Sequence, residues 1–403
     1  MGNVETSKSR NPGAPAIDPG APVPTCRDSL RSDKLQIPLA RPWITQAEID
    51  AVVGVLQTPH LSLGPKVAEF EEAFAAYCGT KHAVACSSGT TGLHLLIRAF
   101  AIGPGDEVIT TPFSFVASSN CVLMERAVPV FVDIDPHTWN IDAARIEAAV
   151  TPKTKAILPV DVFGQIADMD AIHDIAKRRR LSVIEDSCEA LGSSFRGRRA
   201  GSFGDAGVFG FYPNKQLTTG EGGMIVSNDD AVAHLCKSMR NQGRDPEAGW
   251  LAHARLGYNY RLSDMQSALG LAQLRRIGEI VAARTRVQSW YRDRLRDETR
   301  VVLQEVRPGH EVSWFVFVVR LADVYSQADR DRILAGLTER GIGCNNYFTP
   351  IHLQPFFAER FGYRPGSFPV CESVAGRTIA LPFHHELTEG DVDRVCAELR
   401  SML

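Results

Sequence analysis

The stretch 209–223 reads Phe-Gly-Phe-Tyr-Pro-Asn-Lys-Gln-Leu-Thr-Thr-Gly-Glu-Gly-Gly, and it places a single lysine, Lys215, in a turn between two apolar segments. These segments, 206–211 and 223–226, have the short apolar composition that is typical of buried strands. An amine that is partly removed from water in such a turn becomes nucleophilic toward carbonyl groups. Taken alone, the stretch is also compatible with a lysine on an exposed turn, because most lysines are exposed.

Five further apolar runs of strand length precede this turn, and amphipathic runs of helical length lie between them. The predicted strands are 83–86, 107–110, 128–133, 156–160 and 182–185, and the predicted helices are 92–102, 117–126, 141–150 and 168–179. This alternation predicts an α/β fold in which crossover helices build a mostly parallel sheet that is buried on both faces. Ligands of such sheets bind beyond the carboxyl ends of the strands.

The rest of the chain predicts a large domain with two flanking parts. We expect a disordered tail at 1–36, because its proline-rich and polar composition cannot bury enough apolar area to become ordered. The large domain covers 37–285, and a smaller C-terminal α/β domain covers 286–403. The elements predicted here are a long helical stretch at 263–300, a strand at 312–321, and helices at 328–340 and 388–402.

Composition and charge exclude several classes of protein. The 403 residues include 44 Lys+Arg and 47 Asp+Glu, so that no basic excess predicts a nucleic-acid partner. Neither a long apolar run nor a secretion signal is present, and we therefore expect no membrane association. The nine cysteines form no C-x-x-C pair, so we expect neither a disulfide framework nor a metal site, and a cytoplasmic location is the natural one.

Residues 87–92 read Ser-Ser-Gly-Thr-Thr-Gly and lie between a predicted strand and a predicted helix. Small residues let the backbone turn closely, and a helix N-terminus attracts anions, so that Ser88, Gly89, Thr90 and Thr91 could hold a phosphate. An ordinary helix cap is the alternative interpretation.

Two other segments also end at the same predicted edge of the sheet. Asp186 follows the apolar strand 182–185, where its carboxylate could pair with a protonated ring nitrogen or with a metal, or could simply cap a helix. Phe113 and Phe115 follow the strand 107–110, and one of them could present its face to a planar ring or pack in the core. An anion-binding turn, a carboxylate and a lysine at one edge favour a binding site more strongly than each feature does alone.

In this order, these segments resemble the DegT/DnrJ/EryC1/StrS family of sugar aminotransferases, which are fold-type I enzymes that use pyridoxal 5′-phosphate (PLP). The resemblance extends from about residue 37 to the C-terminus. It includes Ile-Pro-Leu-Ala-Arg-Pro at 37–42 and Gly-Tyr-Asn-Tyr-Arg at 257–261. It implies a fold-type I transferase with a large mixed, mostly parallel sheet and a smaller C-terminal domain.

The resemblance also implies a role for each matching residue. Lys215 corresponds to the lysine that binds the cofactor covalently and then moves the proton of the substrate carbon. Asp186 corresponds to the partner of the pyridine nitrogen, Thr90 and Thr91 to the phosphate-binding turn, with Ser88 and Gly89 beside them, and Phe115 to the aromatic residue that stacks on the ring. Asn259 corresponds to a residue that reaches the phosphate of a neighbouring subunit, which implies a homodimer with shared active sites.

Other positions concern the substrate or depart from the family pattern. Tyr212, Tyr347 and His352 correspond to the substrate side of the site, although His352 could equally be a structural histidine. Gly210 stands where many members have a serine that touches the phosphate. Glu189 stands where glutamine is common near the phenolic oxygen of the cofactor, and an ionised carboxylate there would repel that oxygen.

The reaction that the resemblance implies is a ping-pong transamination, in which glutamate donates an amino group that a nucleotide-linked ketosugar then accepts. Three alternatives remain open at this point: a ketocyclitol as the acceptor, a deoxygenation of the kind that 3-dehydrases perform, and a homologue without catalytic activity. The dehydrases replace the reactive lysine with histidine, so the presence of Lys215 favours transamination.

Overall fold

The computed structural model describes residues 36–245, 249 and 251–403, so that the tail predicted for 1–36 lies outside the described residues except for Gln36. The described residues belong to a single unit, Leu35–Leu403. Within them, no helix combines the length and the apolar composition that crossing a membrane requires.

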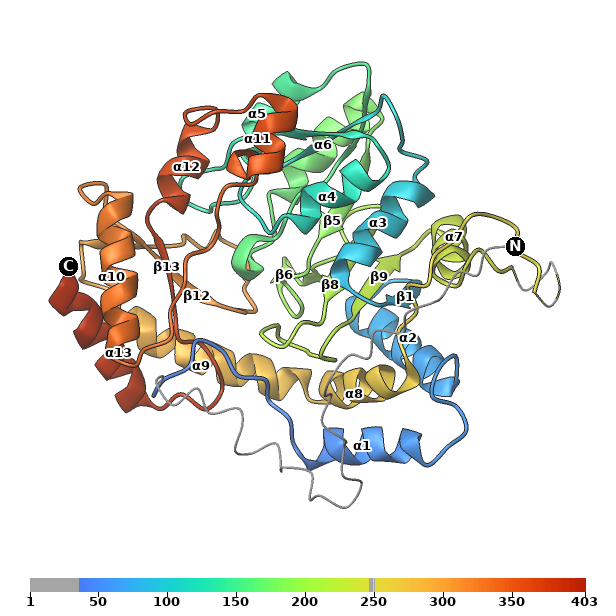
Figure 1. Ribbon diagram of the computed structural model, residues 1–403, viewed down its shortest axis with the longest axis horizontal. Coiled ribbons are helices and arrows are strands. Elements are labelled where there is room, and N and C mark those ends of the chain that lie inside the picture. Colours follow the sequence, from blue (N-terminus) through green and yellow to red (C-terminus); the bar gives the residue numbers. More distant parts are fainter. Residues whose placement is uncertain (1–35, 246–248, 250) are drawn as a thin grey trace, which may run out of the picture. The chain divides into compact units, whose positions relative to one another are not determined.

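Seven strands form the main sheet, in the order β1-β9-β8-β5-β4-β2-β3 (Figure 1). Their bounds are β1 (His82–Cys86), β2 (Glu107–Thr110), β3 (Val128–Phe131), β4 (Thr154–Ile157), β5 (Ser182–Asp186), β8 (Ala206–Gly210) and β9 (Gly223–Ser227). The strands from β3 to β8 pair in parallel, whereas β9 runs antiparallel to both of its neighbours. The predicted strands agree with these bounds to within three residues, and the predicted mostly parallel sheet is confirmed.

Helices cover both faces of this sheet. Alternate strand residues point to opposite sides, and apolar side chains on each side pack against helices. Val84 and Val208 belong to the core on one face, with side chains of α3, α4 and α7. Ala85 and Phe209 belong to the core on the other face, where α2 and α8 pack, and Ile157 lies farther along that face with α5 and α6. The bounds of these helices are α2 (Pro65–Cys78), α3 (Gly89–Ala99), α4 (Ala117–Met124), α5 (Ala143–Ala149), α6 (Met169–Arg179), α7 (Asp230–Arg240) and α8 (Asp264–Arg275).

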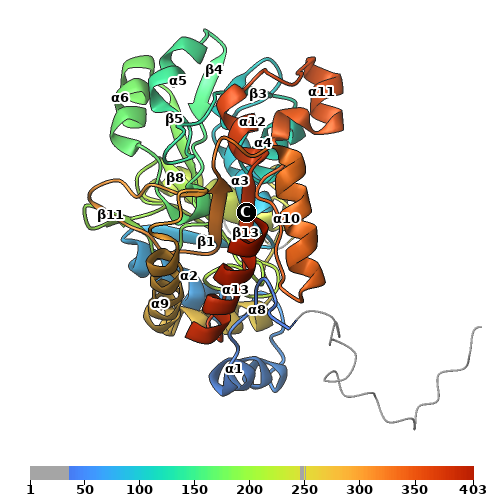
Figure 2. The same ribbon diagram turned by 90° about the vertical axis from the view of Figure 1, so that its left-hand side faces the viewer.

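The C-terminal part contains a second, antiparallel sheet in the order β10-β12-β13, which Figure 2 shows beside α10 and α13. The elements here are α9 (Ile277–Leu295), β10 (Val301–Leu303), β12 (Phe317–Leu321), α10 (Gln327–Glu339), β13 (Thr378–Leu381) and α13 (Glu389–Met402). Along α9, Ile277 packs with the core of the main sheet, whereas Val287 and Tyr291 pack with the second core. The helix therefore runs through position 285, and the domain boundary predicted there stays a prediction.

Several elements differ from the expectation. The single helical stretch expected at 263–300 is two helices, because Arg276 leaves the helical conformation and bonds to Glu48 and Glu279. The strand expected at 312–321 begins only at Phe317, since the Ser313 N–H donates to Ser193 Oγ instead of to a neighbouring strand. The elements that were not predicted are the helices α1 (Gln46–Leu56), α2, α7, α11 (Pro355–Phe361) and α12 (Pro369–Ala375), the strands β10 and β13, the two-residue strands β6 (Ser194–Phe195), β7 (Arg198–Arg199) and β11 (His310–Glu311), and the 3-10 helices Val162–Gly164 and Ile351–Leu353.

Candidate functional site

Lys215 lies in the connection 211–222 between β8 and β9, at the carboxyl end of β8. The two strands pair up to Gly210 and Gly223, and the Phe211 N–H donates to the Gly222 carbonyl at 2.9 Å, so that the sheet holds both ends of the connection. The Lys215 side chain is 15% exposed. Its Nζ lies 4.0 Å from the centre of the Phe315 ring and 3.6 Å from Glu189 Oε1.

Asp186 ends β5, the strand next to β8, and it is 5% exposed. Ser118 Oγ donates a 2.7 Å hydrogen bond to Asp186 Oδ2, and the Cys188 N–H donates to Oδ1 at 3.2 Å. Ser118 lies in the first turn of α4, one turn after Phe115. These two donors fix the orientation of the carboxylate at the edge of the sheet.

The segment 87–92 forms the junction between β1 and α3. Ser88 is the N-cap of α3: its Oγ accepts from the Thr91 N–H at 3.1 Å, and its own N–H donates to Thr91 Oγ1 at 3.0 Å. The first N–H groups of a helix have no partner within the helix, so those of Gly89 and Thr90 are suited to bind an anion. A Cβ on Gly89 would lie 2.7 Å from Cys188 Sγ, so only glycine permits this close packing.

Cys188 shows that these three parts lie together. It bonds to Asp186 through its N–H, and its Sγ packs against Gly89. Burial raises the pKa of the Cys188 thiol well above its usual value, the charge of Asp186 raises it further, and the charge of Lys215 lowers it. Cys188 is therefore within electrostatic reach of both charged groups, and the turn, the carboxylate and the lysine share one edge of the sheet.

Position 210, where a serine is common, lies beside the same turn. A Cβ on Gly210 would lie 3.9 Å from the Cα of Gly89 and 3.4 Å from Cys188 Sγ. Because glycine has no side chain, position 210 offers no hydroxyl to an anion, and the groups predicted for this role are the backbone N–H groups and the hydroxyls of Thr90, Thr91 and Ser88.

The predicted substrate residues lie in different surroundings. Tyr347 is half-buried, its hydroxyl accepts from Asn214 Nδ2 at 3.3 Å, and burial raises its pKa to about 12. Tyr212 is 55% exposed. His352 is fully buried, and its Nε2 lies 2.9 Å from Glu372 Oε1, which favours the structural interpretation of this histidine.

Two predicted cofactor residues are open to solvent. Phe115 is 63% exposed, whereas Phe113 is fully buried in the core, so Phe115 is the one that can present its face to a ring. Asn259 is exposed, although Tyr258 and Tyr260 on either side contact Glu125 and His94. The Tyr260 carbonyl also accepts from the Ser87 N–H at 2.8 Å, so this segment borders the anion-binding turn.

Sequence reasoning missed two residues that hold the site in place. Ser118 was counted only as part of a helix. Arg284, on α9, is buried and forms no salt bridge with any other described residue, and its guanidinium donates to the carbonyls of Phe315, Asn214 and Lys215 at 3.0, 3.3 and 3.1 Å. Burial lowers the pKa of Arg284 to about 10. A carbonyl-bonded arginine leaves no pattern in the sequence that could have been recognised.

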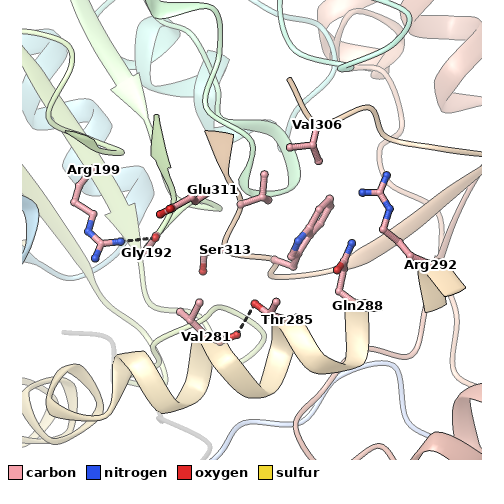
Figure 3. A pocket seen from close by; sticks show the side chains of 11 residues that line it. Gly192, Arg199, Val281, Thr285, Gln288, Arg292, Val306, Glu311 and Ser313 are labelled. Carbon is pink, nitrogen blue, oxygen red and sulfur yellow. Dashed lines mark hydrogen bonds between the residues drawn. The ribbon is translucent and has the colours of Figure 1, made fainter. Parts of the chain in front are cut away.

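A separate cavity of about 440 Å³ lies along α9 (Figure 3). Val281, Thr285 and Gln288 of the helix line it, with Arg199 and Ser313 opposite. None of the site residues predicted from the sequence is among the residues that line it.

Comparisons with known proteins match most of the chain. The model of the DegT/DnrJ/EryC1/StrS aminotransferase family matches residues 42–400. GDP-perosamine synthase of Caulobacter vibrioides is 44% identical over 375 residues, which are 92% of this chain and 100% of that protein. Among solved structures, the PLP form of Spr1654 from Streptococcus pneumoniae has a TM-score of 0.86 at 28% identity, covering 91% of this chain and 98% of that one. PseC of Helicobacter pylori, an aminotransferase involved in the biosynthesis of pseudoaminic acid, has a TM-score of 0.86 at 29% identity, with the same coverage.

Proposed function

The chain belongs to the DegT/DnrJ/EryC1/StrS aminotransferase family, and from this premise we propose that it transfers an amino group from glutamate to the keto group of a nucleotide-linked deoxysugar. As a member, it is a PLP-dependent aminotransferase with the fold of these enzymes, as expected. The 44% identical relative carries the name of a GDP-linked sugar. That name supports a nucleotide-linked acceptor and makes GDP the first nucleotide to test.

The residues at the sheet edge fit PLP in their chemistry. The start of α3 offers unpartnered N–H groups and hydroxyls to a phosphate, in a turn so tight that a side chain on Gly89 would collide with Cys188. Asp186 offers a carboxylate to a protonated ring nitrogen, and the exposed face of Phe115 offers a stacking surface. Lys215 offers the only kind of side chain that can bind an aldehyde as an imine.

When bound, PLP supplies an aldehyde that condenses with amines and a ring that accepts the electrons of a broken C–H bond. The residues of the chain supply the rest. Asp186, oriented by Ser118, would hold the ring nitrogen in its protonated form, and Lys215 Nζ would carry the proton that the substrate carbon loses and regains. Arg284 fixes the backbone of Lys215 through its carbonyl, so that the amine returns to the same place in both half-reactions.

The observation that supports this function most directly is the shared position of Lys215, Asp186 and the start of α3 around Cys188. Transamination needs a nucleophilic amine, an acid that keeps the ring protonated and an anchor for the phosphate. The bond from the Cys188 N–H to Asp186, the close packing of Cys188 Sγ at Gly89 and the electrostatic effect of Lys215 on Cys188 support the assignment of these three groups to one site.

The decisive experiment offers the PLP-loaded full chain ¹⁵N-labelled glutamate together with a panel of GDP-, dTDP- and UDP-linked 3-keto and 4-keto deoxysugars. We expect 2-oxoglutarate to form in step with one sugar product that carries the labelled nitrogen. The Lys215→Ala variant is the matched blank. If only a ketocyclitol gave labelled product, the acceptor would be a ketocyclitol and not a nucleotide-linked sugar. If a sugar lost oxygen without gaining nitrogen, the reaction would be a deoxygenation and not a transamination.

We also propose a homodimer with shared sites in the cytoplasm. Asn259 is exposed while its two tyrosine neighbours are anchored to the chain's own helices, so its amide is free to meet a second copy. The eight cysteines among the described residues are all free thiols, which agrees with a reducing compartment.

A further inference from the structure

The amine of Lys215 and the carboxyl group of Glu189 face each other in an enclosed place. Their side chains are 15% and 7% exposed, and Nζ lies 3.6 Å from Oε1. The Phe315 ring closes the other side of the amine at 4.0 Å. Two opposite charges in such surroundings have lost most of their hydration.

The other groups around Glu189 leave Oε1 directed at the lysine. Oε2 accepts a 2.8 Å hydrogen bond from the Phe163 N–H, and the backbone carbonyl of Glu189 accepts from Gln216 Nε2 at 2.7 Å. Burial raises the pKa of Glu189, the charge of Asp186 raises it further, and the charge of Lys215 and the Phe163 N–H lower it.

Three more titratable groups lie within electrostatic reach of Glu189. Its charge contributes to the raised pKa values of the Cys188 thiol, of the Asp161 carboxyl and of the Tyr347 hydroxyl. Asp161, Asp186 and Tyr347 are acids, and none of them supplies a positive charge that would compete with Lys215 for the carboxylate.

We propose that Glu189 accepts the proton that Lys215 must lose before its amine can attack a carbonyl carbon, and returns it when the amine is released. An N–H bond breaks at Nζ and an O–H bond forms at Oε1, which leaves a neutral amine with a free electron pair and a neutral carboxylic acid. Rotation of the lysine side chain brings the two atoms from 3.6 Å into hydrogen-bond contact. Glutamine at this position could not take up the proton.

The inference rests on the proposed role of Lys215, and it is tested without any sugar substrate. PLP is removed from the full chain with hydroxylamine and added back between pH 7 and 9, and its capture is followed by absorbance. Because the proton stays within the pair of Lys215 and Glu189, the rate of PLP capture by the wild type should change little between pH 7 and pH 9. In Glu189→Gln the rate should rise about tenfold with each pH unit, and at pH 7 it should be about 10²-fold lower than in the wild type.

Matched variants separate the possible causes. Glu311→Gln removes an exposed carboxylate outside the site and should keep the level profile. Glu189→Ala should be slow and should recover its rate with added formate, and thermal unfolding shows whether each variant is folded. A wild-type profile in Glu189→Gln, or an alanine variant that formate does not rescue, would overturn the proposal. If Lys215→Ala captured PLP and gave the same absorbance spectrum as the wild type, the proposed role of Lys215 as the residue that binds PLP covalently would be overturned instead.

Discussion

Asp186 receives its orientation from one hydroxyl group, and the neighbouring residue provides a natural control. Ser118 Oγ donates to Asp186 Oδ2, whereas Ser119 Oγ, equally buried, has no hydrogen-bond partner within the part of the chain that the structure describes. A hydrogen bond to a charged group contributes about 1.5–3 kcal/mol. We therefore expect Ser118→Ala to weaken PLP binding about tenfold or more, and Ser119→Ala to leave it unchanged, as measured by equilibrium dialysis. Equal affinities in the two variants would contradict this role of Ser118.

At the residue scale, the sequence reveals a site residue when that residue directly follows a strand. Lys215, Asp186 and the turn at 87–92 were predicted because parallel strands bring their carboxyl ends to one edge. Ser118 and Arg284 were missed because their partners, Asp186 and Lys215, are 68 and 69 residues away in the chain. Such pairings depend on packing that local patterns do not encode.

At the scale of elements, Glu48 joins α1 to the junction of α8 and α9. Burial alone would raise its pKa, but hydrogen bonds from Thr45, Arg276 and Gln273 outweigh this effect and lower the pKa to about 2. Gln273 Nε2 and Arg276 both donate to Oε1 at 2.9 Å. The ionised group thus stabilises the fold above its unfolded pKa, and this contribution is lost as the pH falls through the folded value.

We expect Glu48→Gln to lower the free energy of unfolding by about 1–3 kcal/mol at pH 7. The difference from wild type should shrink as the pH falls from about 4.5 toward 2, because the wild-type carboxylate then becomes protonated as well. Urea unfolding of both chains at pH 7 and pH 3 measures this. Asp50→Asn, a substitution of an exposed carboxylate in the same helix, is the control. If the difference in unfolding free energy between Glu48→Gln and wild type did not change with pH, the charge of Glu48 would not be the source of the stabilisation.

The same region shows which elements a sequence reveals. The long alternation of strands and crossover helices was predicted because its apolar periods are regular. Helix α1 was missed although Thr45 and Glu48 form a capping box, a signal that could have located its start. The break at Arg276 could not have been predicted, since it depends on a salt bridge to Glu48, 228 positions away.

At the scale of the whole molecule, the proposed homodimer with shared active sites makes a prediction for mixed dimers. We expect Lys215→Ala and Asn259→Ala each to lose most activity, because one lacks the amine and the other a phosphate contact in its partner. Random mixing should restore about a quarter of the wild-type sites, since half of the dimers then hold one intact pair. Sedimentation checks the assembly, and the amination rate counts the sites. No recovery would mean that Asn259 acts within its own chain or not at all.

The fold of the whole chain followed from its motifs more readily than from its periodicity. Alternating strands and helices predicted only an α/β protein. The order of 87–92, Asp186 and Lys215 along the chain identified the family, which the match over 42–400 confirms. The acceptor sugar stays a prediction, because the residues predicted to contact it include exposed side chains such as Tyr212, for which the strand pattern indicates no role.

The hairpin that carries Lys215 has a kinetic consequence. Its two ends continue into the paired strands β8 and β9, and the Arg284 guanidinium donates to the Lys215 carbonyl between them. These bonds restrict movement of the backbone at Lys215. All travel of the reactive nitrogen must come from torsions of its four-carbon stem. The turnover rate should then depend little on the flexibility of this connection and strongly on which rotamers the Lys215 side chain can adopt. The Phe315 ring limits these rotamers, so its size should affect the turnover rate.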